Sequence, residues 1–200
     1  MRFGGIGRQI MKTGIRSAIV LAFVMLGFAA ALTPARSAPD KEFLTPKEIE
    51  KIQDAQEIDK RVKIYLDAGA LRLKTAEERL GGKESEPGDP LELFSVEEMV
   101  DGYYRIMKSV MLNLDDAYQK RDTDKSTLGK ALKSLKDSTE WAAKVLLALK
   151  KSAEEKRNEE LWNLVNQSID INKGAHEGAE LGLSKNPAPA GKSKGKSKKS

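Results

Sequence analysis

The sequence contains no cysteine, a single histidine and few aromatic residues. Of its 200 residues, only His176 is a histidine, and aromatic side chains make up 6%. Without cysteine the chain cannot form disulfides, iron–sulfur clusters, thiolate zinc sites or covalently attached haem. One histidine cannot supply a two-histidine zinc site or the paired Glu-x-x-His motifs of di-iron bundles. We therefore expect no bound cofactor and no metal.

Catalytic motifs are lacking as well. The sequence has no glycine-rich phosphate loop, nucleophile elbow or HExxH pattern. Adjacent acidic residues occur, but consecutive helical positions point about 100° apart and do not converge on a substrate. His176 and Glu180, one helical turn apart, could form half of a weak metal site, although a solvent-facing histidine is the simpler interpretation. We therefore predict that the protein is not an enzyme.

Lysine, glutamate, leucine and alanine dominate the periodic segments of the chain. Apolar residues make up 40% and charged residues 32%, which is a normal balance for a globular protein. Runs of β-branched and aromatic residues, which favour strands, are hard to find. This composition predicts an all-α fold.

The basic residues in excess lie at the two ends of the chain. Residues 1–39 carry five basic residues and residues 185–200 carry six lysines, and neither segment contains an acidic residue. Between them, residues 40–184 carry 24 basic and 30 acidic residues. The formal net charge of +5 therefore gives no reason to expect sequence-specific nucleic-acid binding.

Residues 1–35 have the three-part order of a secretory signal peptide. Basic residues precede an apolar run from Ser17 to Leu32, and small residues follow it. The run of about sixteen residues is short for a membrane span, which needs about 20. Small side chains one and three residues before the cut favour cleavage after Ala35 or Ala31.

These features predict an exported protein, in the periplasm or outside the cell. The alternative is an uncleaved anchor, in which Ser17–Leu32 holds the domain at the membrane. Met1 and Met11 both remain open as translation starts. Because no cysteine follows the apolar run, lipid attachment is excluded.

We predict an elongated antiparallel helical bundle over residues 45–183, after a linker at residues 36–44. The bundle would contain three long helices and a fourth. Capping boxes, which are Thr45 with Glu48 and Ser95 with Glu98, mark the first two helix starts. Apolar residues then recur at steps of three or four. The expected helices are 46–80, 96–121, 126–156 and 159–182.

The boundary between the last two helices is the least certain from local chemistry. No glycine or proline interrupts the sequence there, so one continuous helix from Ser126 to Leu183 is the alternative. The apolar pattern lapses between Ala153 and Leu161, however. We therefore favour a turn near residues 156–159, because a bundle needs a fourth helix of matching length.

Residues 184–200 form a tail rich in lysine, glycine, serine and proline. The tail has no bulky apolar residue, and we expect it to be disordered. It could contact an anionic polymer or an anionic membrane surface weakly and without specificity. The alternative is a solubilising tail without a dedicated partner. The candidate contacts are Lys192, Lys194, Lys196, Lys198 and Lys199.

A glycine in the first helix and the large aromatic residues suggest a pocket. Gly69 lies mid-helix, where glycine costs up to about 1 kcal/mol relative to alanine, so a small side chain is required for close packing or for a ligand. The large aromatics serve either core and edge packing or a ligand groove. The candidate pocket consists of Gly69, Tyr103, Tyr104, Trp141 and Trp162.

Two classes of function follow from these features. The first is a non-enzymatic interaction or envelope-associated module with an unknown protein or envelope partner. The second is a small-molecule- or metal-binding bundle with a pocket near Gly69 and the aromatics. The first is favoured because the sequence contains no catalytic constellation.

Overall fold

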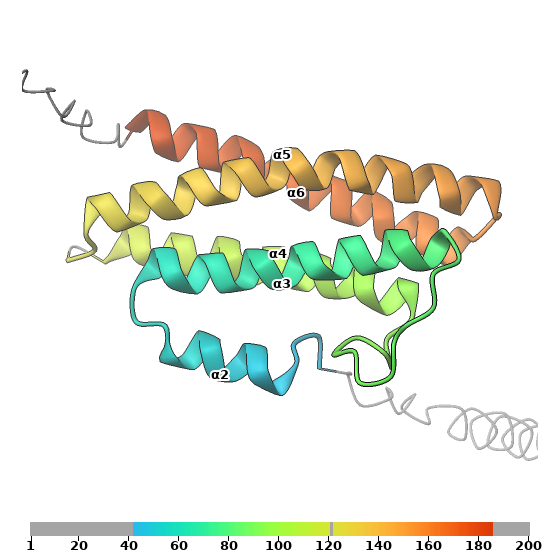
Figure 1. Ribbon diagram of the computed structural model, residues 1–200. Coiled ribbons are helices and arrows are strands. Elements are labelled where there is room, and N and C mark those ends of the chain that lie inside the picture. Colours follow the sequence, from blue (N-terminus) through green and yellow to red (C-terminus); the bar gives the residue numbers. More distant parts are fainter. Residues whose placement is uncertain (1–41, 121, 186–200) are drawn as a thin grey trace, which may run out of the picture. The chain divides into compact units, whose positions relative to one another are not determined.

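The computed structural model describes residues 42–120 and 122–185. Within these residues the chain forms helices and no strand, so the prediction of an all-α helical bundle is confirmed. The helices are α2 (Pro46–Asp54), α3 (Ile58–Leu80), α4 (Val96–Gln119), α5 (Lys125–Glu155) and α6 (Glu159–Lys185) (Figure 1). The predicted signal peptide and the tail lysines lie outside the described residues.

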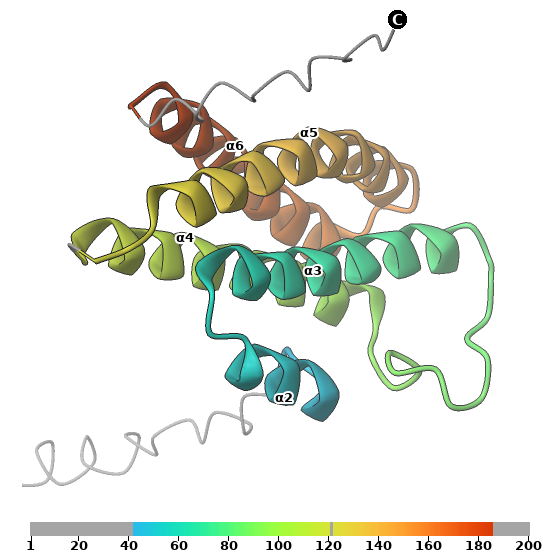
Figure 2. The same ribbon diagram turned by 60° about the vertical axis from the view of Figure 1, so that its left-hand side comes forward.

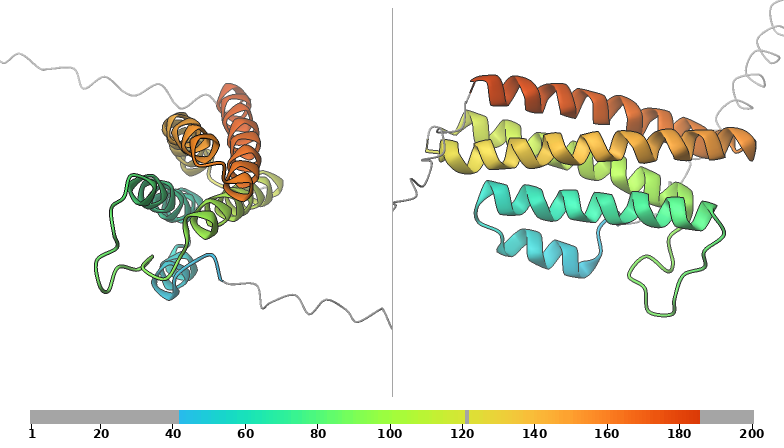
Figure 3. Two further views of the ribbon diagram at one scale, coloured as in Figure 1. Left: turned by 90° about the vertical axis from the view of Figure 1, so that its right-hand side faces the viewer. Right: turned by 45° about the horizontal axis from the view of Figure 1, so that its top comes forward.

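Two helical hairpins stack to make the bundle. The α3 helix packs on α4, and α5 packs on α6; across the hairpins, α3 packs on α5 and α4 on α6. Within each hairpin the helices are antiparallel, whereas α3 and α5 run in the same direction (Figures 1 and 3). Among the described helices, none combines the length and hydropathy needed to cross a bilayer.

The α2 helix lies outside this four-helix arrangement. It packs against α3, on the side of the α3–α4 hairpin that faces away from α5 and α6 (Figure 2). None of its residues is fully buried. Apolar burial therefore contributes less to the position of α2 than to that of the other helices.

The predicted single helix over residues 46–80 is wrong. The helix ends at Asp54 and starts again at Ile58, and between them Ala55 is extended, with φ −76° and ψ 104°. The Arg61 side chain donates two hydrogen bonds to the Ala55 carbonyl, at 3.1 Å from Nε and 2.8 Å from Nη2. The Arg61 side chain thus occupies the carbonyl that would accept from Asp59 N in a continuous helix, which favours the break over the helical preference of this segment.

The turn between α5 and α6 lies at residues 156–158. Asn158 N donates to the Ala153 carbonyl at 2.9 Å and Arg157 N to the Glu154 carbonyl at 3.1 Å, which is the Schellman pattern. Arg157 takes the left-handed conformation, with φ 52°, that glycine usually provides. The Asn158 side chain then caps α6 by accepting from Leu161 N at 3.0 Å.

The core lies where the two hairpins meet, and the apolar stripes of the four long helices fill it. Each helix places leucine, isoleucine or valine there with no exposed surface. Representative members are Leu73, Ile106, Leu146, Leu161 and Val165.

Two glycines on the outer face of α6 allow a test of helix stability. A Cβ added at Gly174 or Gly178 would meet no atom within 4 Å. We expect Gly178→Ala to raise the free energy of unfolding by about 0.5–1 kcal/mol, because alanine is the better helix former. Denaturant titration measures this change.

Gly69→Ala is the matched control for that substitution. Its added Cβ would lie 3.2 Å from Cδ2 of Tyr103, a contact tight enough to offset the gain in helix propensity. If both substitutions stabilised the protein equally, the packing of α3 against Tyr103 would not be as described.

Candidate functional site

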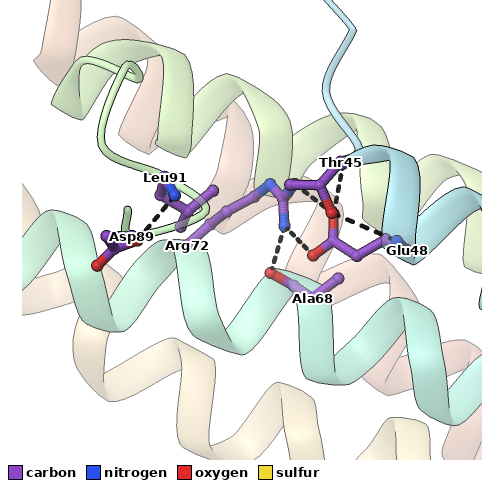
Figure 4. A network of polar contacts seen from close by, with 6 residues as sticks. All are labelled: Thr45, Glu48, Ala68, Arg72, Asp89 and Leu91. Atoms are coloured by element: carbon purple, nitrogen blue, oxygen red, sulfur yellow. Dashed lines mark hydrogen bonds and ion pairs between the residues drawn. The ribbon is translucent and has the colours of Figure 1, made fainter. Parts of the chain in front are cut away.

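A fully buried arginine holds α2 against the bundle. Arg72 of α3 has no exposed surface, and its guanidinium forms two parallel hydrogen bonds with Glu48 of α2 (Figure 4). The distances are 2.9 Å from Nη1 to Oε1 and 2.8 Å from Nη2 to Oε2. Nη1 also donates to the Ala68 carbonyl at 2.8 Å. Such a bidentate pair fixes both position and orientation of the two helices.

Glu48 serves the start of α2 as well as the ion pair. Its Oε2 accepts from Thr45 N at 2.7 Å, and its own backbone N donates to Thr45 Oγ1 at 3.3 Å. Burial by itself raises the pKa of Glu48. The hydrogen bonds from Arg72 and Thr45 and the charge of Arg72 outweigh burial, so the pKa lies below its ordinary value. Glu48 is therefore ionised at neutral pH.

A glycine on α4 makes room for the arginine. A Cβ at Gly102 would lie 3.1 Å from Cδ and 3.2 Å from Nε of Arg72. That Nε is buried and has no hydrogen-bond partner within the described part of the chain. Nearby, the Arg105 guanidinium lies 4.6 Å from the ring centroid of Phe43, just before α2. The site thus joins the start of α2 to both α3 and α4.

A chain of buried polar groups links α4, α5 and α6 elsewhere in the bundle. The Tyr103 hydroxyl donates to Asn172 Oδ1 at 2.6 Å, and Asn172 Nδ2 donates to the Thr139 carbonyl at 3.0 Å. Thr139 Oγ1 lies 3.0 Å from Nδ1 of His176. Burial raises the pKa of Tyr103, so its hydroxyl remains neutral and continues to donate.

This chain reaches the surface at His176. Nε2 of His176 lies 3.7 Å from Oε1 of Glu180, which accepts a 2.8 Å hydrogen bond from Lys136. The hydrogen bond and charge of Lys136 lower the pKa of Glu180. His176 is thus only partly exposed, in contrast to the solvent-facing histidine expected from sequence. In residues 42–120 and 122–185, no group of three or more acidic or histidine side chains could hold a metal.

The structure brings only part of the predicted pocket together. Because a Cβ at Gly69 would touch Cδ2 of Tyr103, the tyrosine ring already occupies the space beside the glycine. Tyr104 lies near the helix surface with Lys108 Nζ 5.4 Å from its ring centroid. This arrangement favours the packing interpretation of Gly69.

The two tryptophans lie nearer the surface, each 39% exposed. Trp162 lines a hollow of about 390 Å³ at the α5–α6 turn, and its Nε1 donates to Glu154 at 3.1 Å. Gly69, Tyr103, Tyr104 and Trp141 are not part of that hollow.

A larger hollow, of about 520 Å³, was not anticipated. It lies where the α2–α3 break meets the connection between α4 and α5. Its lining is mixed in charge and includes Glu57, Arg61, Asp116, Lys120 and Asp124. Because the hollow borders the break between α2 and α3, no side chain of the described residues packs against the break on that side.

Sequence reasoning missed the two most informative polar residues, Arg72 and Asn172. Each lies on the buried stripe of its helix, Arg72 three residues after Gly69 and Asn172 three residues before Ala175. A polar residue at an apolar stripe position was the available signal, because burying such a group requires a partner.

Comparisons with known protein families, curated proteins and solved structures give no match. The class of protein is therefore defined from its fold and its site alone. The described part of the chain is an all-α bundle of two hairpins with a short N-terminal helix held by a buried ion pair.

Proposed function

We propose that the protein is an exported, non-enzymatic interaction module associated with the cell envelope. The observation that carries the proposal is that the buried groups between α4, α5 and α6 contact one another. Tyr103, Asn172 and Thr139 bond among themselves, and the Tyr103 ring fills the space beside Gly69. The outer surface of the bundle would then make the contacts with other molecules.

The outer surface has side chains suited to such contacts. Trp141 and Trp162 each keep 39% of their surface exposed. Tryptophan is enriched at the centres of protein interfaces, where a large rigid ring contributes much contact area. These residues support a protein or envelope partner.

The proposed export rests on residues 1–35, which have the three-part order of a secretory signal peptide. Fractionation of the native host, followed by intact mass and amino-terminal sequencing, tests it. We expect a mature chain beginning at Arg36 or Leu32 in the soluble exported fraction. A full-length chain in the membrane would instead identify Ser17–Leu32 as an anchor, and a full-length cytoplasmic chain would overturn the proposal.

The lysine tail is proposed to add weak electrostatic attachment to an anionic polymer or membrane surface. We expect deletion of residues 185–200 to abolish envelope retention at low salt, and added salt to have the same effect on the intact protein. Retention is measured in the washed envelope fraction. The matched control replaces the five lysines from Lys192 to Lys199 by glutamine, which keeps the tail length. Unchanged retention after deletion would rule out the tail as the attachment.

A further inference from the structure

Residues 55–57, here called the hinge, separate two helices that their local sequence would join. The hinge contains no glycine or proline, and the apolar stripe continues across it from Ile52 through Ala55 and Ile58 to Val62. The α3 helix begins at Ile58, and its N-cap residue, Glu57, makes no side-chain capping bond. The other four described helices each begin with one. The hinge thus lacks the signals that normally end and restart a helix.

Three side-chain contacts hold the hinge bent. The ion pair of Glu48 with Arg72 and the Arg105 guanidinium over Phe43 are long-range. The bonds from Arg61 to the Ala55 carbonyl are local. An isolated helix as short as α2 is not stable in water, so α2 depends on these contacts or on continuation into α3. The hinge also has room to rearrange, because the hollow of about 520 Å³ lies beside it.

A straight helix over residues 46–80 cannot form the ion pair within one chain. Glu48 and Arg72 are 24 residues apart, which corresponds to about 36 Å along a helix at 1.5 Å per residue. Straightening would therefore expose Arg72 and separate it from its carboxylate. A buried guanidinium without a counter-charge is strongly unfavourable, so the vacated surface requires a carboxylate from elsewhere.

We propose that residues 42–54 form an exchangeable arm through which two copies of this chain pair. The hinge becomes helical, and the arm of each copy docks on the α3–α4 surface of the other. Glu48 of one copy then pairs with Arg72 of the other, beside the space that Gly102 leaves. This inference goes beyond the proposed function and depends on neither export nor the tail.

A second copy carries the groups that this surface binds. Its arm carries the same carboxylate, capping box and Phe43 that the surface already accommodates. Because the contacts in the closed and exchanged forms are the same, the two forms differ mainly in the hinge and in protein concentration. Exchange of an identical element is a low-cost route to a dimer for this reason.

Charge reversal tests the exchange directly in the full-length chain. Glu48→Arg places two positive charges together in the closed form, and Arg72→Glu places two negative charges together. Mixed in equal amounts, the two variants can satisfy both sites only by exchanging arms. We expect a 1:1 heterodimer by light scattering with size exclusion and by native mass spectrometry.

The matched control carries both reversals on one chain, E48R/R72E. Because it restores an opposite pair within the chain, it should associate as the natural sequence does, although it lacks the capping bond that Thr45 N donates to Glu48. A mixture that contains only the two separate variants would overturn the proposal. So would capture of each variant by a host protein in place of the other, which would identify a foreign helix as the occupant.

Hinge variants keep the proposal testable if a charge-reversed chain fails to fold. Gln56→Pro blocks the joined helix and suits the closed form, because Ala55 before it is extended and the described backbone bonds do not use Gln56 N. Gln56→Ala is the control that permits the helix. After refolding at high concentration, we expect about 10⁴-fold weaker dimerisation for Gln56→Pro than for Gln56→Ala, because each of the two joined helices in the dimer would carry a proline that costs about 100-fold. Equal dimerisation, or monomers throughout, would overturn the exchange.

Discussion

Replacing Glu48 by glutamine should lower the free energy of unfolding by about 3 kcal/mol, because it leaves the charge of Arg72 buried without a counter-charge. Glutamine keeps the size of the side chain and an oxygen for the capping box, so the change removes mainly the charge. Denaturant titration monitored by circular dichroism measures the loss. Glu50→Gln, exposed on the same helix, is the control and should change stability by less than about 0.5 kcal/mol.

A double variant tests whether the loss in Glu48→Gln comes from the unpaired charge of Arg72. Arg72→Met added to Glu48→Gln removes the buried charge and retains much of its volume. Replacing both partners of a buried pair often costs little, so the double variant should recover most of the lost stability. Natural stability in the single variant Glu48→Gln would mean that the pair does not hold α2 in solution.

The contribution of this pair should also depend on pH. The pKa of Glu48 in the folded protein lies below its ordinary value of 4.5. A lowered folded-state pKa contributes stability that is fully present above the unfolded-state pKa and is lost as the pH falls through the folded-state value. The difference between the natural protein and Glu48→Gln should therefore shrink below about pH 4.5. Glu78 and Glu180 also have lowered pKa values, but they occur in both proteins and cancel.

Asn172→Leu should destabilise the bundle by about 1–3 kcal/mol, because it leaves the buried Tyr103 hydroxyl without its acceptor. The Thr139 carbonyl loses its bond from Asn172 as well, but it lies inside α5 and keeps its intrahelical bond. The same titration measures the change, and Asn163→Leu on the exposed face of α6 is its control.

A double-mutant cycle tests whether the hydroxyl causes that loss. Tyr103→Phe removes the group that Asn172→Leu would leave unpaired, so the double variant should cost less than the sum of the two single variants. Strict additivity would mean that Tyr103 and Asn172 do not interact in solution.

Helix starts could be predicted from sequence because their signals are local. Thr45 with Glu48 and Ser95 with Glu98 form the expected capping boxes. The apolar stripes place the long helices for the same reason: periodicity depends on neighbours three and four residues apart. The turn after α5 was signalled only by a lapse in that pattern, since Arg157 stands where a glycine would have marked it.

The bent hinge and the partners of the buried polar groups could not be predicted in this way. The hinge depends on Arg72, which lies 24 residues from Glu48, and Tyr103 lies 69 residues from Asn172. Such pairings are set by the packing of whole helices, which one sequence does not encode locally. The pocket prediction assumed that Gly69 and the aromatics converge. In the structure the Tyr103 ring fills the space that the glycine leaves.

The stacking of two hairpins has a consequence for the order of folding. Each hairpin joins helices that are neighbours in sequence, so it closes a short loop and can form early, whereas α3–α5 and α4–α6 contacts close longer ones. We expect the α5–α6 hairpin, with its turn of three residues, to form first, and docking of the two hairpins to limit the folding rate. The surface that receives α2 exists only once α3 and α4 have met. The α2 helix, the first of the described helices in sequence, is therefore the last to take its place.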